Sequence, residues 1–221
     1  ESRQLLPDSR VQNLHVGQLD SPLWEKFCEM IDDTAHWVVA SVNPDACEKL
    51  KTAISITSPD AFITVLQNSM LPIESDIQAV EQVGTDRLLA ALAVTAIAPH
   101  SKPAIIIDSG TAVTVDVISP HGTFAGGVIM PGSALIARAL NEGTAQLPQV
   151  VLDQNNAPSP IGKNTQEAIA GGTFWGLIGS INELVRQQRL VLGDSTPVYV
   201  SGGDSWIASH LEFECQSVSN L

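Results

Sequence analysis

Short apolar runs alternate with stretches of helical periodicity along most of this chain. In its N-terminal part, two runs typical of buried strands, residues 36–42 and 62–66, flank a stretch of helical spacing at residues 45–54. A further helix is predicted over residues 22–31, and a weakly alternating edge strand over residues 11–16. Strands that alternate with helices in this order predict a layered α/β fold.

The middle of the chain adds an antiparallel element to this pattern. Residues 84–98 are rich in Leu and Ala and almost free of polar side chains after Arg87, which predicts a helix buried on most of its circumference. A strand is predicted over residues 104–107. Residues 113–118 and 124–130 then read as two strands joined by a Ser-Pro-His-Gly turn, which predicts an antiparallel hairpin.

The C-terminal part continues the alternation of helices and strands. A helix is predicted from Pro131 to about Leu140, and the proline-containing residues 144–160 show no clear period and predict a surface excursion. A long helix follows to about Arg189, and residues 198–201 form a last strand. Asn164 is followed three positions later by Glu167 at the start of the long helix, which resembles a capping box.

Composition limits the classes of partner. A chain of 221 residues with 44% apolar residues can bury a substantial core, as one large domain or two small lobes. A formal net charge of −13 argues against nucleic acid and anionic membranes as partners. No apolar run approaches the roughly 20 residues of a membrane span. The three cysteines, Cys28, Cys47 and Cys215, lie at no metal-ligand spacing and indicate reduced thiols in the cytoplasm.

Candidate chemistry begins where the strand at residues 104–107 ends. The chain passes from a buried β-branched run into Asp108, Ser109, Gly110 and Thr111. A carboxylate at Asp108 can hold a metal ion or its waters, Gly110 leaves room for a phosphate, and Thr111 offers a hydroxyl and an N–H. The plainer alternative for Asp108 is that of a turn residue after a strand.

A second carboxylate, Asp86, lies in the sequence Gly84-Thr85-Asp86-Arg87 at the start of a predicted helix. Two adjacent glycines, Gly202 and Gly203, follow the last predicted strand. Carboxylates and tight glycine turns together indicate phosphoryl transfer, which depends on positioning and charge compensation. Capping of the helix is the alternative role for Asp86.

Five motifs in this order resemble those of the type III pantothenate kinases, members of the acetate kinase, sugar kinase, Hsp70 and actin superfamily. They are GTDR, IIDSGTAVTVDV, GTFAGGVIMPG, GKNTQEA and SGGD. The resemblance implies an actin-like, two-lobed ribonuclease H-like α/β fold, with mixed sheets flanked by helices. The lobes are expected at residues 1–102 and 103–221.

The resemblance also implies an activity: the ATP-dependent phosphorylation of pantothenate to 4'-phosphopantothenate, the first step of coenzyme A biosynthesis. It implies a cytoplasmic homodimer that needs a divalent metal such as Mg²⁺ and a monovalent cation, K⁺ or NH₄⁺. Two alternatives stay open: a kinase for another small hydroxylated acid or a sugar, and a non-catalytic dimeric binding protein of the same fold.

Site residues are carried over from the resemblance position by position. Asp86 is similar to the general base that takes the proton of the substrate hydroxyl, and Asp108 to the ligand of the monovalent cation. The other implied contacts are Gly84, Thr85, Arg87 and Thr165 for pantothenate, and Gly110, Thr111, Gly202 and Gly203 for ATP. Helix capping is an equally good interpretation of Thr165.

The sequence departs from the family pattern at two places. The family opens with a strand and an Asp-x-Gly-Asn-Thr/Ser phosphate loop, whereas Pro7-Asp8-Ser9-Arg10 has no such glycine. We expect that this strand and loop are missing from the sequence; the alternative is a protein that has lost half of its phosphate site. Ile77 stands where the family tends to carry a tyrosine, so one substrate contact is expected to differ.

Overall fold

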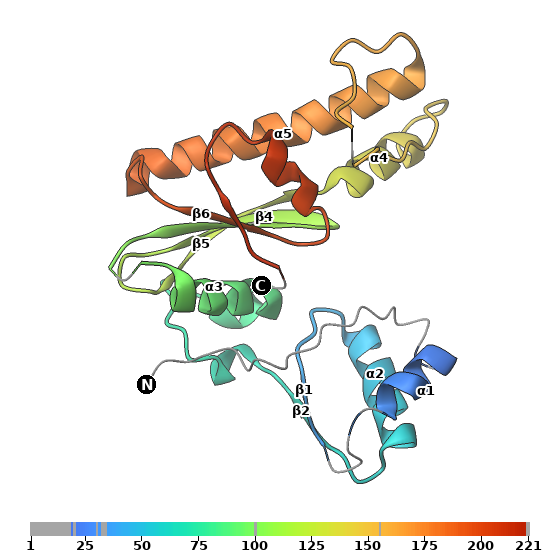
Figure 1. Cartoon of the computed structure of the whole chain (residues 1–221), viewed down its shortest axis with the longest axis vertical. Helices are drawn as coiled ribbons and strands as arrows, with labels where there is room; N and C mark the ends of the chain where they lie inside the picture. Colours follow the sequence, from blue (N-terminus) through green and yellow to red (C-terminus); the bar gives the residue numbers. More distant parts are fainter. Residues whose placement is uncertain are drawn as a thin grey trace. The chain divides into compact units, whose positions relative to one another are not determined.

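Two compact units make up the chain in this computed structural model (Figure 1). Residues 19, 21–29, 31, 35–99, 101–154 and 156–219 are described by the structure. The first unit comprises residues 1–72 and 79–88, and the second comprises residues 73–78 and 89–221. The predicted boundary at residue 102 stays a prediction, and the edge strand predicted over residues 11–16 lies outside the described residues.

The first unit contains a parallel strand–helix–strand element, as the sequence predicted. Strand β1 (His36–Val39) pairs in parallel with β2 (Phe62–Val65), and helix α2 (Pro44–Thr57) connects them. The predicted strand over residues 36–42 is shorter than expected because Asn43 caps α2: its side-chain Oδ1 accepts a hydrogen bond of 3.0 Å from the Ala46 N–H.

An aromatic cluster forms the core of the first unit, and helix α1 (Pro22–Cys28) supplies two of its side chains. The Trp24 side chain is 3% exposed, and its ring centre lies 5.8 Å from that of Phe27 and 6.0 Å from that of Trp37. Trp24 and Trp37 therefore serve packing in this unit. Val39, Cys47 and Ile54 complete the buried cluster.

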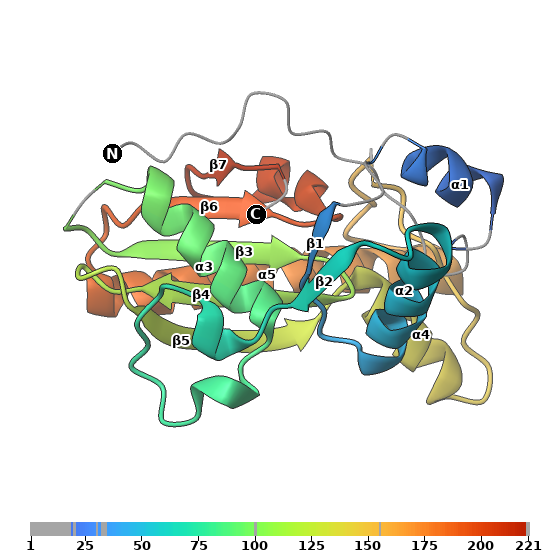
Figure 2. The same ribbon diagram turned by 90° about the horizontal axis from the view of Figure 1, so that it is seen from below.

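The second unit is built on one five-stranded sheet, with the order β5-β4-β3-β6-β7 (Figure 2). Its strands are β3 (Ala104–Ser109), β4 (Ala112–Ile118), β5 (Phe124–Pro131), β6 (Val198–Ser201) and β7 (Gln216–Ser217). The first three form an antiparallel meander, and β6 and β7 run parallel to β3. This is the mixed sheet of a ribonuclease H-like fold, so the expected fold class is confirmed.

Helices cover both faces of this sheet (Figure 1). On one face lie α4 (Ser133–Glu142) and the 28-residue α5 (Thr165–Leu192), and on the other lies the part of α3 (Thr85–Ile97) that follows residue 88. The core under α5 consists of alternate residues of the strands together with one stripe of the helix. Its fully buried side chains include Ile105, Ile107, Val113, Val115, Phe174, Leu177, Ile181 and Val200.

The predicted hairpin is confirmed, and the pair Gly126-Gly127 is part of its strand structure. The pairing of β4 with β5 shifts register between Val117 and Ile118, opposite Gly126, whose φ is +98°. A Cβ on Gly127 would collide with the carboxylate and backbone of Asp116. These contacts make the glycine pair part of a β-bulge within the hairpin.

Helix α5 and the excursion before it contact each other closely. Gly171 leaves room for the Ser159 carbonyl, and the Trp175 indole N–H donates to the Pro158 carbonyl at 3.0 Å. Both residues of the helix therefore contact the 144–160 segment. Within the described ranges, no helix is long and apolar enough to cross a lipid bilayer. The three cysteines are free thiols.

Candidate functional site

Asp108 lies at the carboxyl-terminal edge of the sheet in the second unit. It is the penultimate residue of β3 and pairs with Thr114 of β4 on one side and Ser201 of β6 on the other. The sequence predicted a strand that stops at residue 107, but the ladder continues to Ser109 because β4 pairs directly with β3. The strand therefore fixes the Asp108 backbone on both sides, more rigidly than a turn would.

The glycine turn after β6 contacts Asp108 directly. Gly202 has φ +99°, and a Cβ at this position would collide with the Asp108 carboxylate and with the backbone of Ser109. Gly203 faces open space. Because β3 and β6 are parallel, their carboxyl ends meet at one edge, and this brings the predicted residues Asp108, Gly202 and Gly203 together.

The turn between β3 and β4 carries the other two residues predicted for ATP. Thr111 is exposed, and its carbonyl accepts a hydrogen bond of 2.9 Å from the Gly132 N–H. Gly132 approaches so closely that a Cβ would collide with the carbonyls of Gly110 and Thr111. The predicted residues Gly110 and Thr111 therefore lie beside the start of helix α4.

Helix α4 presents its N-terminus at this edge. Gly132 is the N-cap, and no side-chain oxygen caps the first turn. The first N–H groups of a helix have no partner within the helix, and together with the helix dipole they attract phosphate groups. The edge therefore combines a carboxylate, an exposed threonine hydroxyl and backbone N–H donors, which suits a nucleotide phosphate with its cation.

Asp204 links four segments at the same edge and was not singled out by the sequence analysis. Its carboxylate accepts hydrogen bonds from the Ser133 hydroxyl at 3.2 Å and from the Gln154 side-chain amide at 2.9 Å. Its backbone N–H donates to the Ser109 carbonyl at 2.8 Å. The one signal for Asp204 in the sequence was its place directly after the two glycines.

The sequence Gly84-Thr85-Asp86-Arg87 lies in the first unit, and its last three residues begin α3. The exposed Asp86 side chain turns back over Gly84, where a Cβ would collide with its carboxylate. Its Oδ1 also accepts a hydrogen bond of 2.9 Å from the Arg87 N–H. The Thr85 hydroxyl donates to the Asn68 side-chain oxygen at 2.8 Å.

Thr165 is the first residue of α5, and its side chain is exposed. The neighbouring Asn164 caps the helix: its Oδ1 accepts from the Glu167 N–H at 2.9 Å, and the Glu167 carboxylate accepts from the Lys163 N–H at 2.7 Å. The predicted N-cap is thus confirmed, while Glu167 reaches back to the residue before the cap and not to the N–H of Asn164 as in a standard capping box. In the described part of the chain, no hydrogen bond joins Thr165 to the residues around Asp108, so its substrate role stays a prediction.

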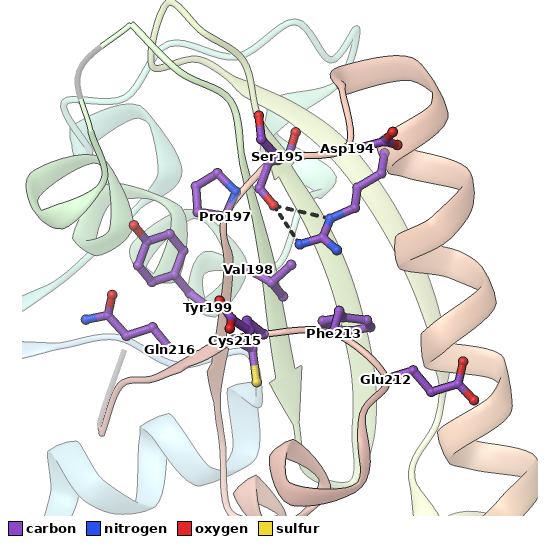
Figure 3. Close-up of a pocket in the computed structure, with 12 residues that line it drawn as sticks. Asp194, Ser195, Pro197, Val198, Tyr199, Glu212, Phe213, Cys215 and Gln216 are labelled. Atoms are coloured by element: carbon purple, nitrogen blue, oxygen red, sulfur yellow. Dashed lines mark hydrogen bonds between the residues drawn. The ribbon is translucent and has the colours of Figure 1, made fainter.

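A cavity of about 670 Å³ lies at the opposite end of β6 (Figure 3). The Arg189 guanidinium contacts the Thr196 carbonyl there at 2.9 Å and lies 5.3 Å from the centre of the Phe213 ring. Burial raises the pKa of the Tyr199 phenol and of the Cys215 thiol above their ordinary values, so both stay protonated at neutral pH. None of the predicted site residues lines this cavity.

Metal ligation at the sheet edge has to come from few protein groups. Among the described residues, no group of three or more His, Cys, Asp or Glu side chains is placed to hold a metal ion. Magnesium ions in phosphoryl-transfer sites are commonly held by one or two carboxylates, water and the substrate phosphates. The oxygen-rich surroundings of Asp108 fit a hard cation bound in that way.

Known proteins are similar to most of this chain. A family model described as type III pantothenate kinase matches residues 7–187. The type III pantothenate kinase of Caulobacter vibrioides is 31% identical over 184 residues, which are 83% of this chain and 69% of that protein. Those of Akkermansia muciniphila and Chlorobaculum tepidum are 38% and 37% identical, and the matched parts are 66% and 63% of their lengths.

One solved structure has the same fold. A conserved protein of the Baf family from Campylobacter jejuni superposes with a TM-score of 0.56 at 20% identity, over 88% of this chain and 80% of that one. At this level of identity the likeness concerns the fold alone. The chain spans about two thirds of the length of the relatives in sequence.

Proposed function

The chain belongs to the type III pantothenate kinase family, and from this premise we propose that it transfers the γ-phosphoryl group of ATP to the primary alcohol of pantothenate. The observation that carries the proposal is the edge of the second unit, where Asp108, the Gly202 turn and the N-terminus of α4 meet. We also propose that the protein works in the cytoplasm as a homodimer, as the family resemblance implies.

The nucleotide is proposed to bind at this edge of the second unit. Thr111 offers its exposed hydroxyl, and helix α4 begins beside the turn that carries this threonine. The Gly202-Gly203 turn, which has no side chain, gives the adenosine close access to the backbone. Phosphoryl transfer needs this kind of fixed positioning and compensation of charge more than it needs covalent catalysis.

Two cations are part of the proposal, and Asp108 is the residue that would hold them. A divalent ion such as Mg²⁺ neutralises charge on the β- and γ-phosphates when it is bound. A monovalent ion, K⁺ or NH₄⁺, would be bound by the Asp108 carboxylate together with neighbouring oxygen atoms. An all-oxygen environment is the ligand set that hard cations prefer.

Pantothenate is proposed to bind at the Gly84–Arg87 turn of the first unit, with Thr165 as a further contact. Asp86 takes the proton of the substrate alcohol as its oxygen attacks the γ-phosphorus. The Arg87 guanidinium meets the pantothenate carboxylate, for which arginine is geometrically suited. Ile77 cannot supply the hydroxyl that a tyrosine would offer at the same position, so we expect one polar contact to pantothenate fewer than the family resemblance implies.

The direct test is ADP release by the complete protein in the presence of ATP and Mg²⁺. We expect release with pantothenate and little release with pantothenyl alcohol, which has the same reacting hydroxyl but no carboxylate for Arg87. Sugars and short hydroxy acids serve as the other acceptors. Release that is faster with one of these than with pantothenate would assign the protein to a different small-molecule kinase activity.

Activity is expected to depend on the monovalent cation. At equal ionic strength, ADP release should be severalfold faster in KCl or NH₄Cl than in NaCl, because Na⁺ is too small for the same oxygen ligands. The Asp108→Asn variant should lose this difference, since the amide carries no charge to hold the ion. Equal rates of the unchanged protein in the three salts would contradict the role assigned to Asp108.

A further inference from the structure

The side chain of Asn68 binds the chain on both sides of Gly84. Asn68 begins the short 3₁₀ helix η2 (Asn68–Met70) just after β2, and it is partly buried. Its side-chain N–H groups donate to the carbonyls of Val80, at 2.8 Å, and Val83, at 2.7 Å. Its side-chain oxygen accepts from the Thr85 hydroxyl at 2.8 Å. All four residues belong to the first unit.

Only an amide can make this set of contacts. Two backbone carbonyls face the nitrogen and a hydroxyl faces the oxygen, so the site requires two donors and one acceptor on one planar group. Aspartate would place a second carboxylate oxygen against the Val80 and Val83 carbonyls, and serine is too short to reach all three partners. The residue type therefore follows from the geometry of the turn.

The contacts of Asn68 lie on both sides of Gly84, and the Asp86 carboxylate is placed over this glycine. Val80 and Val83 precede Gly84, and Thr85 follows it, so the amide holds the chain on both sides of the glycine. The Asp86 carboxylate rests over Gly84, and one of its oxygens accepts from the Arg87 N–H. A shift of the turn relative to η2 would move the Asp86 carboxylate with it.

We infer that Asn68 is a positioning residue for the reaction: it fixes the start of α3, and thereby the direction of the Asp86 carboxylate toward the substrate alcohol. This inference rests on the proposed role of Asp86 as the base. Asn68 touches neither the substrate nor the reacting atoms. Its effect is expected on the alcohol substrate, because the nucleotide edge belongs to the second unit and shares no hydrogen bond with Asn68 among the described residues.

Kinetics of the complete protein with variants of Asn68 test the inference. In Asn68→Asp, kcat/KM for pantothenate should fall by about 10²-fold, the size of effect that follows from a misplacement of about 1 Å, while KM for ATP stays within about twofold. Asn68→Ala removes the same contacts without adding a charge, and it carries the test if the aspartate variant does not fold. Unchanged kcat/KM for pantothenate in a folded variant would overturn the inference.

A matched control is Asn141→Asp. The Asn141 side-chain N–H donates to the Leu147 carbonyl at 2.7 Å in the second unit, so the substitution makes the same chemical change at an amide outside the proposed site. We expect normal kcat/KM in this variant. Two outcomes would show a general structural effect and overturn the inference. One is that Asn141→Asp loses as much kcat/KM for pantothenate as Asn68→Asp does. The other is that Asn68→Asp raises KM for ATP as much as it raises KM for pantothenate.

Hydrogen–deuterium exchange supplies a readout that does not require activity. The backbone amides of residues 80–88 should exchange faster in Asn68→Ala than in the unchanged protein, and those of residues 104–131 should not change. Unchanged exchange over residues 80–88 would overturn the inference by itself. A wild-type protein that releases no ADP with pantothenate would contradict the proposed function instead, and the exchange measurement would still decide whether Asn68 holds the turn.

Discussion

Asp86→Asn is expected to lower kcat for pantothenate-dependent ADP release by about 10²–10⁴-fold, the usual contribution of a general base. The amide oxygen of asparagine can still accept the hydrogen bond from the Arg87 N–H, and the side chain has the same size above Gly84. The start of α3 should therefore be retained while the proton acceptor is lost. Steady-state kinetics at saturating ATP and pantothenate measure the effect, with KM for ATP as the second readout.

Asp45→Asn is the matched control for this prediction. Asp45 is the second residue of α2, just as Asp86 is the second residue of α3, and both lie in the first unit. Each substitution removes one negative charge from a helix N-terminus, where such charges are favourable. If Asp86 merely stabilised its helix, the two variants would differ little in thermal midpoint and neither would lose turnover. That outcome would remove Asp86 from the role of base.

Gly202→Ala is expected to abolish most of the nucleotide binding and to destabilise the second unit. The positive φ alone costs a side-chain-bearing residue about 1–3 kcal/mol. The added Cβ also collides with the Asp108 carboxylate and the Ser109 backbone, so β6 or the turn after β3 has to move. We expect kcat/KM for ATP to fall by about 10²-fold in the protein that still folds, because a displacement of about 1 Å has this effect in general.

Gly193→Ala separates backbone strain from the collision. Gly193 also has a positive φ, of +106°, at the end of α5, but open space surrounds the position of its Cβ. This variant should lose stability through the backbone alone and keep its KM for ATP. Thermal unfolding and ATP titration of both variants give the comparison. If KM for ATP rose equally in the two, the contact between Gly202 and Asp108 would not be what shapes the nucleotide edge.

Hydrophobic patterns predicted most elements of this fold because the patterns are local. The helix at residues 84–98 and the hairpin at residues 113–130 agree with α3, β4 and β5 to within a few residues. The pairing of β3 with β4 was not predicted, because the intervening Ser109–Thr111 segment was interpreted as a ligand turn and not also as a strand connection. Strand β7 has two residues and too little pattern to be recognised.

The sequence predicted those residues of the candidate site that lie at or just after the end of a strand. Asp108, Gly110 and Gly202 could be found because parallel strands bring their carboxyl ends to one edge. Asp204 and Asn68 were missed because their significance depends on partners far away in sequence, such as Ser133 and Thr85. Hydrogen bonds across such separations leave no periodic or local signal in a single sequence.

The strand order of the second unit has a consequence for how the chain folds. Strands β3, β4 and β5 are joined by short turns, whereas β6 has to pair with β3 across the excursion and the whole of α5. Contacts that are local in sequence form early, and distant ones form late. We therefore expect the meander at residues 104–131 to assemble first and β6 to dock last. Since Gly202 arrives with β6, a folding intermediate with an intact meander has no finished site for ATP, and the ability to bind nucleotide marks the completion of folding.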